Sequence, residues 1–101
     1  MEAKIYDHIS NSGIVQMLGR SFPAVAIQGD SLSSILSTAK YFMSKAKEHG
    51  DEDMYYEALE LAERLQGHLI QYEQVLENEG LERPYNMDVR GLNLEQEFKN
   101  T

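Results

Sequence analysis

The 101-residue chain is long enough for one domain, contains no cysteine and carries a formal net charge of −8. The lack of cysteine excludes disulfides and thiolate metal sites, and so acidic a surface repels phosphate backbones, so we expect no nucleic-acid partner. The sequence shows neither a signal peptide nor an apolar run of the ~20 residues that span a membrane. We therefore expect a soluble, cytoplasmic protein without membrane contact.

The first third of the chain predicts short strands at about residues 3–9, 14–18 and 22–28. β-Branched and aromatic residues recur in these runs, and turn signals at Ser10–Gly13 and Leu18–Ser21 separate them. Pro23 has no N–H to donate to a neighbouring strand, so we expect it at the start of the third strand or on a sheet edge. The pattern favours a small antiparallel sheet of two or three strands.

A first helix is predicted over residues 31–49. Its apolar residues recur one, three or four positions apart and form one stripe, which consists of Leu32, Ile35, Leu36, Ala39, Phe42, Met43 and Ala46. Gly29 is expected to end the preceding strand, and Asp30 or Ser31 to cap the helix by accepting a backbone N–H bond. Gly50 occupies the position typical of a left-handed helix end.

A longer helix is predicted over residues 51–79, with Gly80 at its end. Its apolar stripe consists of Met54, Ala58, Leu61, Ala62, Leu65, Leu69, Tyr72 and Leu76. The connection at Gly50 and Asp51 is so short that the two helices must form an antiparallel hairpin. Residues 84–101 predict an irregular tail that docks on the domain or orders on a partner. The expected fold is α+β, with a single domain over residues 1–83.

The long helix carries a second, partial stripe beside the first. It consists of Tyr55, Leu59, Ala62, Gln66 and Ile70, and Gly67 lies near it. A glycine inside a helix costs about 1 kcal/mol relative to alanine and often permits close backbone approach. Two interpretations follow. Either the helix is sandwiched between the first helix and the sheet, or the second stripe joins a second copy or a partner.

Negative charge is concentrated in the second half of the chain. The net charge is +1 for residues 1–50 and −9 for residues 51–101. An acidic face on the long helix suits a basic protein partner, with tyrosines as anchors of the contact. The alternative is that surplus glutamate serves solubility. The partner-binding candidates are Tyr55, Tyr56, Glu57, Leu59, Glu60, Glu63, Ile70, Glu73 and Glu77.

Evidence for catalysis or metal binding is weak. His49, Asp51 and Asp53 lie close together in sequence, but negative charge at a helix start already accounts for the two carboxylates. The chain has no cysteine, and its serines between positions 31 and 37 fit the first turns of a helix. We therefore expect no enzyme activity, no cofactor and no metal.

The segment Arg20-Ser-Phe-Pro-Ala-Val-Ala-Ile-Gln-Gly-Asp-Ser-Leu32 resembles a small family of uncharacterised bacterial proteins. These share an Arg-x-Phe-Pro-Gly-x-x-Ile/Val-Gln-Gly-Asp-Ser/Thr-Leu pattern, from which Ala24 departs. Some proteins of this kind are similar to immunity proteins, which neutralise a neighbour's toxin. The resemblance directs attention to Arg20, Gln28, Gly29 and Asp30. Local roles at the turn are the alternative for Gln28 and Asp30.

The sequence as a whole predicts a non-enzymatic protein-binding module. In its sharpest form this is an immunity or inhibitor protein that presents an acidic helical face to a basic partner such as a nuclease toxin. The alternative is a structural or regulatory homodimer or larger homo-oligomer, joined through the long second helix.

Overall fold

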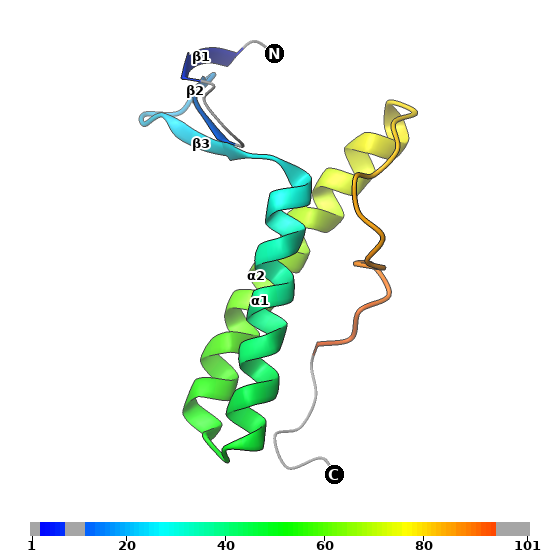
Figure 1. The fold of residues 1–101 in the computed structure, drawn as a ribbon. Helices are drawn as coiled ribbons and strands as arrows, with labels where there is room; N and C mark the ends of the chain where they lie inside the picture. Colours follow the sequence, from blue (N-terminus) through cyan, green and yellow to red (C-terminus); the bar gives the residue numbers. More distant parts are fainter. Residues whose placement is uncertain (1–2, 8–11, 95–101) are drawn as a thin grey trace.

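The computed structural model describes residues 3–7 and 12–94 of the chain. Three strands precede two long helices (Figure 1). The elements are β1 (Ala3–Asp7), β2 (Ser12–Met17), β3 (Ala24–Ile27), α1 (Gly29–Glu48) and α2 (Glu52–Asn78). The predicted α+β fold, a small antiparallel sheet followed by a helical hairpin, is confirmed.

The strands form an antiparallel sheet in the order β1-β2-β3. Pro23 directly precedes β3, which lies at an edge, so it occupies the position expected of it. β2 begins earlier than predicted, because Gly13 pairs with Ala26 instead of ending a turn. The register shifts between Ile5 and Asp7 of β1. Residues 8–9 of the predicted first strand and the start of the following turn lie outside the described residues.

Helix α1 begins two residues earlier than predicted, at Gly29. Its N-cap is Gln28, which has extended backbone angles (φ −61°, ψ 146°) and makes no side-chain capping bond. The expectation that Asp30 or Ser31 caps the helix is therefore wrong. Asp30 lies inside the first turn, where its Oδ1 accepts the Ser31 N–H bond at 2.8 Å. A carboxylate there is still favourable, because it faces the positive end of the helix dipole.

The hairpin turn is fixed from both sides. Gly50 has φ +70°, and the N–H groups of Gly50 and Asp51 donate to the carbonyls of Lys47 and Ala46. This is the left-handed helix end that glycine favours. The Asp51 carboxylate then accepts the Met54 N–H bond at 3.0 Å and caps α2. The predicted hairpin and the role of Gly50 are confirmed.

The core lies along the contact between the two helices. Its fully buried residues include Leu36 and Ala39 of α1 and Ala62 and Leu69 of α2. The predicted stripes were too wide, because four of their members are exposed: Ile35, Phe42, Met54 and Leu61. These four flank the contact, since two packed helices bury the rows that face each other and leave flanking rows to other elements.

The described part of the tail covers one flank of this contact. It runs back along the hairpin from the end of α2 (Figure 1), and Val89 and Leu94 are buried in the core. The tail thus docks on the domain. Most of the second stripe of α2 is sandwiched between α1 and the tail, not between α1 and the sheet, because Gln66 bonds to tail carbonyls and Leu59 is buried. Its last member, Ile70, is 39% exposed.

The sheet projects from one end of the hairpin (Figure 1). The Cα radius of gyration is 16.1 Å, against about 13 Å for a compact domain of this length. One extended residue, Gln28, joins β3 to α1. The sheet therefore adds length to the molecule, and among the residues whose burial the structure describes, the hydrophobic core takes no member from it.

Candidate functional site

One row of exposed residues lies on the side of α2 that points away from α1. We call it the outer face, and it consists of Tyr56, Glu60, Glu63, Gly67 and Ile70. Alternating steps of four and three keep these residues on one side of a helix. A Cβ at Gly67 would find open space. The outer face thus presents an aromatic and an aliphatic side chain, with carboxylates and bare backbone between them.

The aromatic side chain of the outer face is supported from below. The rings of Tyr55 and Tyr56 meet edge to face, with centroids 5.2 Å apart and planes at 85°. Tyr55 is only 2% exposed, and its burial, followed by the neighbouring Tyr56, raises the pKa of Tyr55. Tyr55 is therefore the buried support, and Tyr56 is the ring that a partner would meet.

The outer face keeps most of its negative charge. Arg64 pairs with Glu60 at 2.8 Å, but both groups are exposed. Such helical pairs contribute about 0.3–0.5 kcal/mol and are screened by salt. Among the described residues, Glu63 forms no ion pair, and neither does Glu57, which follows Tyr56 in the sequence. This side of α2 therefore has carboxylates available to an incoming cation.

Three of the predicted partner-binding residues are buried. Tyr55, Leu59 and Glu73 are 2%, 7% and 6% exposed. They share the row of α2 that meets α1 and the tail, so they are unavailable for contact at the surface. The remaining predicted residues are exposed: Tyr56, Glu57, Glu60, Glu63, Ile70 and Glu77.

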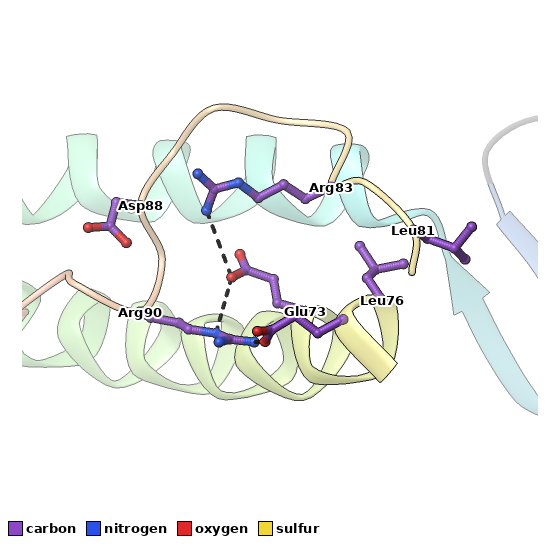
Figure 2. Close-up of a pocket in the computed structure, with 7 residues that line it drawn as sticks. Glu73, Leu76, Leu81, Arg83, Asp88 and Arg90 are labelled. Atoms are coloured by element: carbon purple, nitrogen blue, oxygen red, sulfur yellow. Dashed lines mark ion pairs between the residues drawn. The ribbon is translucent and has the colours of Figure 1, made fainter. Parts of the chain in front are cut away.

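Glu73 instead holds the tail in place (Figure 2). Its carboxylate accepts the Tyr85 hydroxyl at 2.6 Å and lies 3.4 Å from Arg90 Nε and 3.9 Å from Arg83 Nη1. Arg90 also pairs with Glu77. Burial, and then the hydrogen bond from its hydroxyl to Glu73, raise the pKa of Tyr85 well above its ordinary value. We call this group of five residues the Glu73 clamp.

A pocket of about 260 Å³ lies beside the Glu73 clamp (Figure 2). Its charged walls are Glu73, Glu77, Arg83, Asp88 and Arg90, and its apolar walls are Leu76 and Leu81. Both arginines already pair with glutamates, so they offer little attraction to an anion. Asp88 accepts the Gly91 N–H bond at 3.1 Å. The pocket is best explained as the gap left where the tail turns back onto α2.

A second attachment of the tail lies further along α2. Gln66 Nε2 donates to the carbonyl oxygens of Val89 and Leu92, at 3.0 and 2.8 Å. The contacts that hold the tail on α2 were not predicted from the sequence. They involve Gln66 of α2 and Arg83, Tyr85 and Arg90 of the tail. A weak signal was present, since a glutamine interrupts the apolar stripe and two arginines follow the acidic end of the helix.

Gly29 has a packing role. A Cβ at this position would overlap the outer end of the Tyr72 ring, so a larger residue there requires the ring to move. Gly29 was expected to end the strand. It is instead the first residue of α1. The Tyr72 ring lies against the start of α1, so it is turned toward α1 and is unsuited to anchor a partner.

The other residues of the resemblance segment are exposed and stand apart. Arg20 lies in the β2–β3 connection, and Gln28 and Asp30 lie beyond the opposite end of β3. Arg20 is held through its backbone, with its N–H donating to Met17 O at 3.2 Å and its carbonyl accepting from Gln16 Nε2 at 2.7 Å. The Arg20 and Asp30 side chains make no ion pair within the part of the chain that the structure describes.

Residues 3–7 and 12–94 contain neither a metal-binding cluster nor a membrane-spanning helix. No group of three or more His, Asp or Glu side chains there is arranged to hold a metal ion. No helix there combines the length and the apolar character needed to cross a bilayer.

Comparison with known proteins identifies the chain at the level of its family. No curated protein and no solved structure matches it significantly. Residues 1–85 match a family described as a family of unknown function, DUF6959. The match takes in the sheet, both helices and every residue of the Glu73 clamp except Arg90. The chain belongs to DUF6959, a family of unknown function, which confirms the expectation of an uncharacterised domain.

Proposed function

We propose that this protein is a non-enzymatic protein-binding module that receives a basic partner on the outer face of α2. Its sharpest form is an inhibitor or immunity protein directed against a cationic protein such as a nuclease toxin. The observation that carries the proposal is the exposed Tyr56, supported by buried Tyr55 and flanked by Glu57, Glu60 and Glu63.

The chemistry of the outer face suits an unlike partner better than a second copy. In a symmetric dimer the same patch meets itself, so glutamates of one copy would approach those of the other. Like charges opposite one another suppress such a contact, whereas a basic surface is attracted at long range. The homo-oligomer predicted through this helix is therefore the weaker candidate, and Leu59, which was to join it, is buried.

The Glu73 clamp supports a binding role over a catalytic one. Glu73 and Tyr85 are bonded to each other, and the arginines beside them pair with glutamates. Each partner comes from α2 or from the tail, so this network already has a structural purpose. The exposed tyrosine and carboxylates of the outer face are the groups left for contact with another molecule.

The test is affinity capture from a lysate of the source organism, eluted with rising salt and followed by measurement of affinity for the purified partner. Tyr56→Ala should weaken binding by ~30-fold or more, as truncation of an aromatic hot spot does. Glu57→Lys with Glu63→Lys should chiefly slow association and reduce its dependence on salt.

Glu79→Lys with Glu82→Lys is the matched control. Both residues are exposed, and the double substitution changes the net charge by the same amount outside the outer face. This control should retain most of the affinity. Equal losses in the two double variants would mean that overall charge, not the outer face, attracts the partner. Unchanged binding by Tyr56→Ala would overturn the proposed surface.

A further inference from the structure

The sheet leaves apolar side chains uncovered on both faces. Cross-strand pairing places Ile5 and Met17 on one face and Val25 and Ile27 on the other. Ile5 and Val25 are each 63% exposed, and Phe22 in the β2–β3 connection is 82% exposed. Sheets with apolar residues on both faces are normally covered on both. Short three-stranded sheets also depend on such packing for stability.

The edge of β3 is open to pairing. Within the described residues β3 pairs with β2 alone, which leaves its other edge without a neighbouring strand. Natural proteins protect exposed edges with charged side chains, prolines or bulges. The four residues of β3 are Ala24, Val25, Ala26 and Ile27, and its register with β2 is regular. Pro23 precedes the strand and the strand is short, but β3 itself carries neither a charged side chain nor a bulge along this edge.

A cleft adjoins the same strand. It has a volume of about 480 Å³ and separates β3 from the hairpin. Its apolar lining includes Val25 and Ile27 of β3, Leu32 of α1, and Tyr72 and Val75 of α2. The exposed strand is thus continuous with an apolar recess that a side chain from another chain could fill.

We propose that a second copy of this chain pairs with β3, antiparallel and about a two-fold axis near Val25. Charge complementarity singles out this occupant. Arg20 and Asp30 are the charged residues nearest to β3 in the sequence, and each lies five positions from Val25. Antiparallel pairing about Val25 brings the Arg20 end of each copy to the Asp30 end of the other, twice in one symmetric contact.

The same pairing engages the exposed phenylalanine. Residues 22 and 28 are equidistant from Val25, so the Phe22 end of each copy comes to the Gln28 end of the other. A stable dimer needs roughly 800 Å² from each partner, which four strand residues cannot supply alone. The exposed Phe22 side chain next to each strand adds apolar surface to the backbone pairing. This interface is separate from the outer face of α2 and is independent of the proposed function.

The first experiment measures the mass of the full chain by sedimentation equilibrium over a range of concentrations. The expected result is a reversible dimer of twice the 11.5 kDa chain mass. Val25→Lys should weaken it ~100-fold or more, because it sets a charge at the axis against its own symmetry mate. Leu61→Lys, at another exposed apolar position (48%, against 63% for Val25) on α2, is the control and should leave the dimer intact.

A charge swap tests the orientation. Arg20→Glu and Asp30→Arg should each weaken the dimer by about 5–10-fold, and the doubly swapped R20E/D30R chain should recover most of the loss. Circular dichroism at low concentration would show that each variant still folds. Recovery in the double variant distinguishes pairing between the two residues from separate local effects of each substitution.

The register is tested through the absence of native cysteine. Val25→Cys should form a disulfide-linked dimer rapidly on mild oxidation, because the two-fold axis brings the two thiols together, whereas Leu61→Cys should not. A chain that stays monomeric at all concentrations would overturn the proposal, including the case in which β3 accepts an extended segment of another protein. A dimer insensitive to Val25→Lys would overturn it equally.

Discussion

The hairpin and the sheet of this molecule use their apolar residues in opposite ways. In the hairpin, Leu36 and Leu69 face each other and the tail closes over one flank. In the sheet, Val25 and Ile5 face solvent. The hairpin with its tail therefore has a buried core within one chain, while Phe42 and Leu61 on its flanks are exposed. Stability therefore resides in the hairpin and tail, whereas the stability of the sheet depends most on coverage by another molecule.

The largest expected difference comes from truncating one apolar residue in each region. Leu69→Ala removes a fully buried side chain and should cost about 2–5 kcal/mol of unfolding free energy. Val25→Ala, in dilute protein, should cost less than about 0.5 kcal/mol, because its side chain is largely exposed. Urea unfolding of the two variants measures both values. Comparable losses would mean that the sheet is packed as tightly as the hairpin.

The Glu73 clamp gives the next effect. Glu73→Gln removes the negative charge that Arg83, Tyr85 and Arg90 share, and should destabilise the protein by about 1.5–3 kcal/mol. Hydrogen exchange should show faster opening around Val89 than in the hairpin turn. The control Glu60→Gln breaks an exposed pair and should cost no more than ~0.5 kcal/mol. Equal losses in the two variants would contradict a clamp that anchors the tail.

Two glycine substitutions sharpen the comparison at the root of the sheet. Gly29→Ala drives a methyl group against the Tyr72 ring and should cost about 1–3 kcal/mol. Gly67→Ala, in open space on α2, should instead stabilise by up to ~1 kcal/mol. Thermal unfolding of both variants, and of Gly29→Ala combined with Tyr72→Leu, tests the contact. Failure of Tyr72→Leu to restore stability would place the strain elsewhere.

The smallest effect is a dependence on pH. An unfolded tyrosine ionises near pH 10.0, whereas the folded protein holds Tyr85 neutral because its pKa is raised. The stability contributed by Tyr85 is thus complete below this pH and is lost as the pH rises above it. Between about pH 9.5 and 11.5 the wild type should lose stability more steeply than Tyr85→Phe, by at most ~1.4 kcal/mol per pH unit. Parallel curves would contradict the raised pKa.

The hairpin was largely predictable from the sequence, because its signals are local. Periodic apolar residues define both helices, and Gly50 marks the turn between them. Periodicity does not reveal which of several adjacent apolar rows is covered, so Phe42 and Leu61 were expected in the core and are exposed. The predicted cap at Asp30 was wrong because α1 begins one residue before Asp30, at Gly29, with Gln28 as its N-cap. Gly29 also lies close to Tyr72, a tertiary contact more than forty residues away that no local pattern reveals.

The candidate site was predicted in part. Tyr56, Glu60, Glu63 and Ile70 do share one exposed side of α2. Tyr55 and Glu73 turn inward because the tail packs where the sheet was expected. Helix periodicity does not reveal that the tail, and not the sheet, covers this side of α2. The Glu73 clamp joins α2 to residues from Arg83 onward through tertiary contacts alone, so no local pattern could have placed its arginines and tyrosine together.

The single residue between β3 and α1 has a mechanical consequence. Gln28 is the single residue between β3 and α1, and Gly29 packs against Tyr72. We therefore expect the sheet and the hairpin to rotate together about this point. Helix α1 is about 30 Å long at 1.5 Å per residue, so a rotation of ~10° at its root moves the far turn by about 5 Å. Whatever grips the sheet therefore also sets the direction in which the hairpin points.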